Sequence, residues 1–407
     1  ESAVRLLTTR YLLGLFDGSE YDKIPYSVVE CKEHIDEALK MARKSCVLLK
    51  NDGVLPIDKT KVNTIGVIGP NADSRAALIG NYHGTSSEYI TVLEGIREEA
   101  GDDVRILYSQ GCDLYKDKVE NLAWDQDRIS EAVITAENSD VVILCVGLNE
   151  TLEGEEGDTG NSDASGDKVD LHLPKVQEEL IEKVTAVGKP TIVVLMAGSA
   201  IDLNYAQDNC NGILLAWYPG ARGGRAIADL LFGKESPSGK LPITFYKDLE
   251  GMPEFTDYSM KNRTYRYMEK EALYPFGYGL TYSDTCVTEA EVVGEVSAES
   301  DIMLKATVKN NGTVDTDEVV QVYIKDLDSP LAVRNYSLCG FKRVSLKAGE
   351  EKSVEFTISN KAMNIVDEDG NRYIAGKHFR LFAGVSQPDT RSAELTGHKP
   401  AEIEIAL

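Results

Sequence analysis

The chain has 407 residues, of which 42% are hydrophobic, so it can bury the cores of two or three domains and is not an intrinsically disordered chain. Its formal net charge of -24 disfavours nucleic acid and anionic membrane surfaces as partners, whereas a neutral substrate is compatible with it. No apolar run approaches the roughly 20 residues that a membrane-spanning helix needs.

Two amphipathic helices are predicted in residues 1–60. The first covers residues 1–18 and ends in glycine-containing turns, and the second runs from residue 31 to residue 51. In both segments the apolar residues recur every three to four positions, which is the spacing of one helix face. We therefore expect residues 1–60 to be a helical region that leads into the first domain.

From residue 61 to residue 247 short apolar runs alternate with helical patterns. The apolar runs predict strands at residues 62–69, 104–108, 141–147, 189–198 and 212–218, and the patterns between them predict helices at residues 127–137, 173–188, 199–207 and 223–233. Continuously apolar strands are buried on both faces, which is typical of parallel sheets covered by helices on each side. This part of the chain is predicted to be an α/β sandwich domain.

The last 160 residues have a different pattern. Residues 248–290 are rich in Tyr, Gly and Pro, and we expect them to form a connector that straps the domains together, because tyrosine rings bury large areas. From residue 291 to residue 407 apolar and polar residues alternate with a period of two, in runs that predict strands at residues 302–310, 319–326, 352–359 and 378–385. Several short alternating strands indicate a β-sandwich.

An acidic loop follows the predicted strand at residues 141–147. Its sequence is "ETLEGEEGD", and within it Glu155 lies between Glu153 and Glu156. In an open α/β sheet, ligands bind beyond the carboxyl ends of the strands. Crowded carboxylates there can raise the pKa of one member, so that it holds a proton for general acid catalysis. A solvated surface loop and a cation site are the alternatives, although the order of a calcium-binding loop is missing.

No cofactor or metal is expected from the remaining motifs. The glycines at residues 66–73 do not follow the GxGxxG order, no GxxxxGK[ST] stretch occurs, and the five histidines lack the HExxH spacing. The seven cysteines are scattered and contain no CxxC, which favours buried thiols in a reducing compartment over a disulfide framework. The compartment stays unknown, with the cytoplasm slightly favoured over secretion, and a homodimer stays open.

Seven ordered motifs resemble the family 3 glycoside hydrolases along essentially the whole chain. They are "ARKSCVLLKNDGVLPI" (42–57), "IGNYHGTSSEYITVLEGI" (79–96), "LEGEEGD…GDKVDLHLP" (152–174), "AWYPGARGGRAIADLLFGKESPSGKLPITF" (216–245), "MKNRTYRYM" (260–268), "YPFGYGLTY" (274–282) and "LCGFKRVSLKAGEEKSVEFTI" (338–358). The last resembles the family's fibronectin type III-like domain. The second is similar to the β-xylosidase-like branch of the family.

The resemblance implies a retaining exo-β-glycosidase acting on non-reducing terminal β-D-xylosyl or β-D-glucosyl residues, with xylosides favoured. In the family's loop the general acid/base is the Glu that follows a small residue, which here is Glu155 after Gly154, with Glu153 and Glu156 as fallback candidates. The nucleophile of the family lies in an N-terminal (β/α)₈ barrel. Residues 1–18 resemble the closing helix of that barrel, so we expect the barrel to come from another segment or chain, and this chain alone not to hydrolyse glycosides.

Other residues carry weaker expectations from the same resemblance. Tyr82 and His83 could line the leaving-group side of the site, although packing between domains is an alternative, and Asp167 is a further candidate for substrate binding. Lys168 follows Asp167 where the family usually has arginine, and lysine lacks the planar fork of that side chain. For Trp217, which ends a predicted strand, packing against the core is favoured over a sugar platform.

Two rival functions remain at this stage. One is a non-catalytic carbohydrate-binding or scaffold module, and the absence of tryptophan from residues 291–407 favours a scaffold role for that part. The other is a nucleotide-binding α/β protein, which would show measurable nucleotide affinity.

Overall fold

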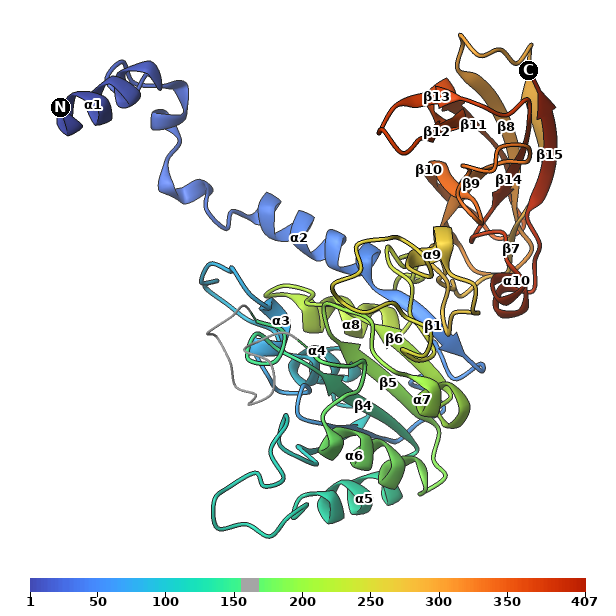
Figure 1. Ribbon diagram of the computed structural model, residues 1–407. Coiled ribbons are helices and arrows are strands. Elements are labelled where there is room, and N and C mark those ends of the chain that lie inside the picture. The colour runs from blue at the N-terminus through green and yellow to red at the C-terminus, as the bar shows by residue number, and fades with distance from the viewer. Residues whose placement is uncertain (155–167) are drawn as a thin grey trace.

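A six-stranded sheet forms the centre of the first domain in the computed structural model, which describes residues 1–154 and 168–407 (Figure 1). Its order is β1-β6-β5-β4-β2-β3, and all neighbours are parallel except β1, which pairs antiparallel with β6. The strands are β1 (Val47–Asn51), β2 (Thr64–Ile68), β3 (Arg105–Ser109), β4 (Val141–Gly147), β5 (Thr191–Met196) and β6 (Gly212–Leu215).

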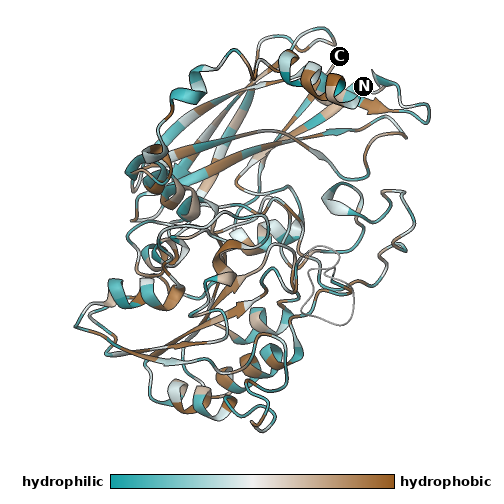
Figure 2. Cartoon of the chain, turned by 90° about the vertical axis from the view of Figure 1, so that its left-hand side faces the viewer, coloured by the Kyte–Doolittle hydropathy of each residue, from teal (hydrophilic) through white to brown (hydrophobic). Residues whose placement is uncertain are grey.

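Helices cover both faces of this sheet. One core cluster joins the sheet to α5 (Ile129–Glu137), α6 (Lys175–Thr185) and α7 (Asn204–Asn209). The other joins it to α3 (Ala76–Ile79), α4 (Val92–Ala100) and α8 (Gly223–Leu231). The central strands β4 and β5 are buried at every position and consist almost entirely of hydrophobic residues, and brown dominates the strands of this sheet in Figure 2. The predicted α/β fold is confirmed.

The close contact of α4 with α8 follows directly from their sequences. Thr91 and Glu94 form a reciprocal capping box that starts α4. One turn later Gly95 faces Gly224 of α8, and a Cβ atom added to Gly95 would lie 2.1 Å from the Gly224 carbonyl oxygen. Glycines at both positions therefore let the two helix backbones touch, and a side chain at either would force them apart.

The predicted second helix is wrong in its last third. α2 covers Lys32–Ser45 and then stops, and after Cys46 the five residues Val47–Asn51 form the edge strand β1. Val47, Leu48 and Leu49 are consecutive and fully buried, with Leu48 facing one core cluster and its two neighbours the other. Three consecutive buried residues fit a strand between two helical layers better than one face of a helix, so tertiary burial overrode the helical spacing.

The second domain is a β-sandwich, as the period-two pattern predicts. One sheet has the order β10-β9-β14-β15, the other has the order β11-β8-β7, and their inner side chains share one core cluster. The strands are β7 (Thr285–Val293), β8 (Ile302–Asn310), β9 (Thr316–Asp326), β10 (Ser337–Leu346), β11 (Glu351–Ile358), β14 (His378–Gly384) and β15 (Ala401–Ala406), with a small hairpin of β12 (Asn364–Val366) and β13 (Arg372–Ile374) and the helix α10 (Thr390–Thr396) beside them.

The tyrosine-rich connector, which we expect to be a strap, contributes side chains to both cores. Tyr274 and Tyr278 are fully buried in the core of the α/β domain and stack on one another. Tyr265, in the short helix α9 (Thr264–Tyr267), instead packs with Tyr323 and Tyr336 of the β-sandwich. A single segment therefore contributes large aromatic side chains to both domains.

A buried ion pair crosses the boundary between the domains. Lys240 of the α/β domain lies 2.8 Å from the carboxylate of Glu318 on β9, and both side chains are almost fully buried. Lys240 also donates to the Gly279 carbonyl oxygen, and Glu318 accepts from the Thr285 hydroxyl and from the amide of Val319. These additional hydrogen bonds stabilise the ammonium and carboxylate groups, which water does not reach at this buried site.

An N-terminal arm extends away from the α/β domain (Figure 1). It contains α1 (Ser2–Leu12) and two short 3-10 turns (Glu20–Lys23 and Tyr26–Val28), and none of their residues is buried. Its exposed apolar side chains include Leu7, Tyr11, Leu12 and Phe16. Among the helices that the structure describes, none combines the length and the apolar character needed to cross a membrane.

Replacing Lys240 by Met should destabilise the chain by about 3–5 kcal/mol, because the Glu318 carboxylate would remain buried without its partner. Urea unfolding, followed by fluorescence, measures the change in the free energy of unfolding. Lys305→Met is the matched control, since Lys305 and Glu291 form a solvent-exposed pair at 3.7 Å, for which we expect less than about 1 kcal/mol. Equal losses in the two variants would contradict a special role for the buried pair.

Candidate functional site

The sheet has a topological switch point between β2 and β4. The chain leaves β2 towards β3 on one side and returns to β4 on the other, so the two connections diverge above the carboxyl ends of β2 and β4. Asn71, just after β2, is fully buried, and its side-chain amide donates to the Leu148 carbonyl oxygen just after β4, at 3.1 Å. The loops that follow β2 and β4 thus begin side by side at this edge.

Three of the predicted acidic residues, Glu155, Glu156 and Asp167, lie outside the described residues. The described parts on either side are residues 148–154 and 168–173, and both contact the same stretch after β5. On the first side, the Leu148 amide donates to the Met196 carbonyl oxygen at 2.8 Å. The acidic loop therefore leaves the sheet at the carboxyl end of β4. This is the position expected from the sequence, in which the loop follows residues 141–147.

Of the glutamates of the acidic loop that the structure describes, Glu153 makes the most hydrogen bonds. Its carboxylate accepts the Gly198 amide at 2.6 Å and the Tyr218 hydroxyl at 2.6 Å, and it also accepts the hydroxyl of Ser199. The donors follow β5, which neighbours β4 in the sheet, and β6, which is the next strand beyond β5. We call this group of four residues the Glu153 anchor.

Tyr218 also brings the loop after α3 next to the anchor. A Cβ atom added to Gly80, in the loop after α3, would lie 2.7 Å from the Tyr218 ring, and one added to Gly198 would lie 3.1 Å from it. Gly80 has φ +58°, a conformation that disfavours side chains. Burial, together with the adjacent Glu153 carboxylate, raises the pKa of Tyr218, so its hydroxyl stays a hydrogen-bond donor at neutral pH.

The residues after the acidic loop are fixed to the same stretch. The Lys168 ammonium donates to the Ala200 carbonyl oxygen at 2.8 Å, and the Leu171 carbonyl oxygen accepts the Asp202 amide at 2.7 Å. Burial lowers the pKa of Lys168, while Glu153 and Asp170 act in the opposite direction. The lysine that replaces the family's usual arginine thus still binds the sheet edge, through one backbone carbonyl.

His172 adds a second fixed point on this side of the loop. Its Nδ1 lies 2.9 Å from a carboxylate oxygen of Glu178 on α6, and this hydrogen bond raises the pKa of the imidazole. Both ends of the acidic loop are consequently attached to the body of the α/β domain, one through Glu153 and the other through Lys168, Leu171 and His172.

Tyr82 and His83 lie in the loop between α3 and α4. His83 is exposed, with Nδ1 2.9 Å from the Gly84 carbonyl oxygen, and Tyr82 is exposed with φ +54°. The far end of this loop is held by Glu30, just before α2, whose carboxylate accepts the amide of Ser87 at 2.9 Å. Both side chains are therefore at the surface of the α/β domain rather than in its core.

The two tryptophans have different surroundings. Trp217 packs against the core, and its indole N–H donates to the Ser45 carbonyl oxygen at 3.1 Å, which confirms the prediction of core packing. Trp124 is exposed, in the loop between β3 and α5. Trp217 therefore shapes the end of β6, next to Tyr218.

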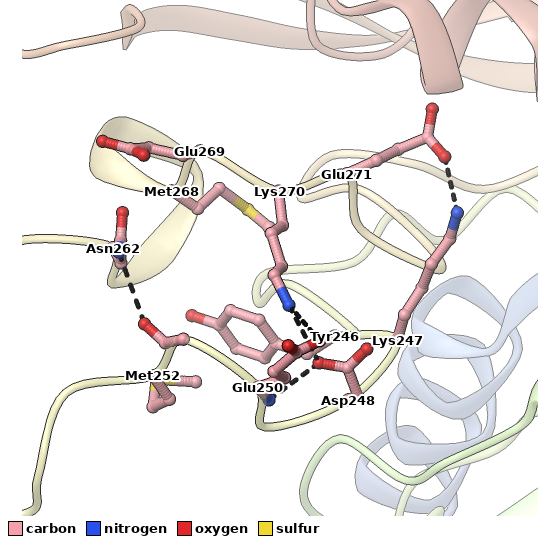
Figure 3. Close-up of a pocket in the computed structure, with 11 residues that line it drawn as sticks. Tyr246, Lys247, Asp248, Glu250, Met252, Asn262, Met268, Glu269, Lys270 and Glu271 are labelled. Carbon is pink, nitrogen blue, oxygen red and sulfur yellow. Dashed lines mark hydrogen bonds and ion pairs between the residues drawn. The ribbon is translucent and has the colours of Figure 1, made fainter.

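A separate cavity of about 350 Å³ lies in the connector (Figure 3). The lysines that line it already have partners: Lys247 lies 2.6 Å from Glu271, and Lys270 lies 2.7 Å from Glu250. The hydroxyl of Tyr246 accepts the amide of Thr264 at 2.9 Å. Each of these two lysines is thus already paired with a carboxylate of the connector.

The described residues contain no cluster of three or more His, Cys, Asp or Glu side chains that could hold a metal ion. All seven cysteines are free thiols, and four of them are buried: Cys46, Cys112, Cys145 and Cys210. Burial raises the pKa of Cys46 and of Cys112 to about 12, so both stay unreactive thiols.

The sequence did not single out Gly198, Ser199 or Tyr218. They fall at the ends of the predicted strands at residues 189–198 and 212–218, and Tyr218 belongs to the quoted motif "AWYPG". The available signal in the sequence was a polar residue directly after a continuously apolar strand, which could have marked Ser199 and Tyr218 as site residues.

Comparisons with known proteins agree with this architecture. The pattern of the glycosyl hydrolase family 3 C-terminal domain matches residues 46–282, and that of the fibronectin type III-like domain matches residues 318–387. A curated β-xylosidase of Formosa agariphila is 35% identical over 97% of this chain and 55% of its own length. A periplasmic β-glucosidase of Salmonella typhimurium is 32% identical over 93% of this chain and 53% of its own. The chain thus spans about half the length of these curated relatives.

Solved structures show the same correspondence. A β-glucosidase from Erythrobacter marinus superposes with a TM-score of 0.78 at 32% identity, over 94% of this chain and 51% of that one. A family 3 exo-β-xylosidase in complex with a xylobiose aziridine probe gives a TM-score of 0.82 at 26% identity, over 98% and 52%. With more than half of its residues matched by the family's C-terminal domain, this chain belongs to glycoside hydrolase family 3.

Proposed function

We propose that this chain forms the C-terminal half of a retaining exo-β-glycosidase and supplies its general acid/base, Glu155. The observation that carries the proposal is the attachment of both ends of the acidic loop to the carboxyl edge of the sheet, through Glu153 and Lys168. An α/β sheet binds its ligands at that edge. The relatives that cover this chain are named β-xylosidases and β-glucosidases, which supports the same activity.

In this proposal Glu155 works with a carboxylate nucleophile from an N-terminal (β/α)₈ barrel. Retaining hydrolysis needs the two carboxyl groups about 5–5.5 Å apart. Glu155 first gives its proton to the leaving glycosidic oxygen and then removes a proton from the water that attacks the glycosyl-enzyme. Neighbouring carboxylates favour the protonated form of the acid before the first step.

The substrate class follows from the relatives and from the motifs. The most similar curated relatives reported above include one named for xylosides and one named for glucosides. The sequence "GNYHG" around Tyr82 resembles the β-xylosidase-like branch, so we expect β-D-xylosides to be the better substrates. Exposed His83 and Tyr82 lie on a loop beside the anchor, where they can line the leaving-group side.

The N-terminal arm is the part that would meet the barrel. An isolated helix of 11 residues is marginal in water, so α1 needs a partner to be stable. Leu7, Tyr11 and Phe16 expose apolar surface that such a partner would cover. The partner we propose is the N-terminal half that this chain's relatives possess in addition to the matched part.

Amide hydrogen exchange tests the role of the arm. In the 407-residue chain the amides of α1 should exchange nearly as fast as in an unfolded peptide, whereas in a protein that includes the N-terminal half they should be protected. The amides of β4, buried in both forms, are the internal control. Fast exchange of α1 in both proteins would argue against docking of the arm on the barrel.

Replacing Glu155 by Gln tests the acid/base assignment in the protein that includes the N-terminal half. We expect the variant to lose at least about 100-fold in kcat/KM on an alkyl β-xyloside, because general acid catalysis typically contributes 10²–10⁴-fold. Nitrophenyl xyloside, whose leaving group needs little protonation, should lose much less in the first step. Turnover of both xylosides and glucosides with each leaving group is the measurement.

Two outcomes would contradict the assignment. If the Glu155→Gln variant keeps wild-type turnover of the alkyl xyloside, Glu155 is not the proton donor. If the 407-residue chain alone hydrolyses these glycosides, the nucleophile does not come from an N-terminal barrel. Glu254→Gln, an exposed residue of the connector, is a matched control and should leave the kinetics unchanged.

A further inference from the structure

The contacts of Glu153 distinguish it from a proton donor. Both of its carboxylate oxygens are occupied: Oε2 by the Gly198 amide and the Tyr218 hydroxyl, and Oε1 by the Ser199 hydroxyl. A carboxylate accepts hydrogen bonds, and this one is supplied with three donors from its own chain. Three of the roughly four hydrogen bonds that a carboxylate can accept are thus formed within the chain, which holds Glu153 on the sheet edge.

The anchor also joins the segments that follow three neighbouring strands, and it contacts the loop between α3 and α4. Glu153 follows β4, Ser199 follows β5, and Tyr218 follows β6. The Tyr218 ring lies against Gly80, which begins the loop between α3 and α4 that carries Tyr82 and His83. Hydrogen bonds between charged and neutral groups in a half-buried place are stronger than those between neutral groups. One carboxylate and one phenol thus fix the relative positions of the loops that border the switch point.

The side chains of Glu153 and Tyr218 pack closely against Gly198, which leaves little room for another arrangement of the anchor. A Cβ atom on Gly198 would lie 3.2 Å from Oε2 of Glu153 and 3.1 Å from the Tyr218 ring. The pairing therefore depends on a glycine after β5, on a tyrosine after β6 and on a glutamate after β4. The glutamate is two positions before Glu155.

We infer that Glu153 and Tyr218 are positioning residues, which set the register of the acidic loop and of the Tyr82–His83 loop on the sheet edge. The inference rests on the proposed function, because it assigns Glu153 to holding the loop rather than to proton transfer. A misplacement of about 1 Å can cost a catalytic group about 100-fold in rate, so loss of the anchor should affect kcat more than KM.

The first experiment uses the 407-residue chain and does not depend on activity. Hydrogen exchange should show the Gly198 amide at least about tenfold less protected in Glu153→Ala than in the wild type, since its acceptor is removed. Tyr205→Phe is the matched control for a Tyr218→Phe variant, because the Tyr205 hydroxyl contacts Thr185 at 3.1 Å, between α7 and α6, and not at the sheet edge. Unchanged exchange at Gly198 would show that the anchor does not hold in solution and would overturn the inference.

The second experiment measures kinetics in the protein that includes the N-terminal half. In Tyr218→Phe and in Glu153→Gln we expect kcat to fall about 10- to 100-fold, KM to change less than about twofold, and the basic limb of the pH–rate profile to persist, because the proton donor is still present. Tyr205→Phe should keep wild-type values.

Two kinetic results would overturn the inference. If Glu153→Gln removes the basic limb and azide restores its turnover, Glu153 is itself the acid/base. If Tyr218→Phe behaves as Tyr205→Phe does, the anchor does not position the loop. A wild-type protein that hydrolyses neither glycoside would instead refute the proposed function, and the exchange at Gly198 would still decide whether the anchor exists.

Discussion

The structure of this chain depends on burial of both faces of one parallel sheet. Strands β4 and β5 are buried at every position, and helices cover them on each side. Polar chemistry is therefore excluded from the faces and remains available only at the ends of the strands. Asn71, Glu153 and Tyr218 all lie at the carboxyl ends, and the acidic loop begins there as well.

Prediction from the sequence succeeded where burial alone decides the structure. The run at residues 141–147 has seven consecutive apolar or small residues, and β4 covers the same seven. Alternation with a period of two identified β8 at residues 302–310 for the corresponding reason, since one face of that strand is buried and the other is not. In both cases the local pattern and the tertiary environment agree.

Prediction was wrong or incomplete where distant residues decide. Residues 47–51 keep the spacing of a helix, yet they form β1 because β6 offers an open edge and two helical layers bury them. The contacts of Glu153 could not be predicted, since Gly198 and Tyr218 lie 45 and 65 positions further along the chain. Their convergence follows from the strand order, which the sequence pattern does not reveal.

The tyrosine-rich connector has a consequence for how genes of this type can be recombined. Tyr274 and Tyr278 complete one core, while Tyr265 completes an aromatic cluster of the other domain, and the Lys240–Glu318 pair lies at the same boundary. A crossover between two parental genes within this segment would combine half of each interface with an unmatched counterpart. The β-sandwich and its connector should therefore be inherited as one block, and chimaeras joined instead inside the exposed turns of the arm should retain both cores.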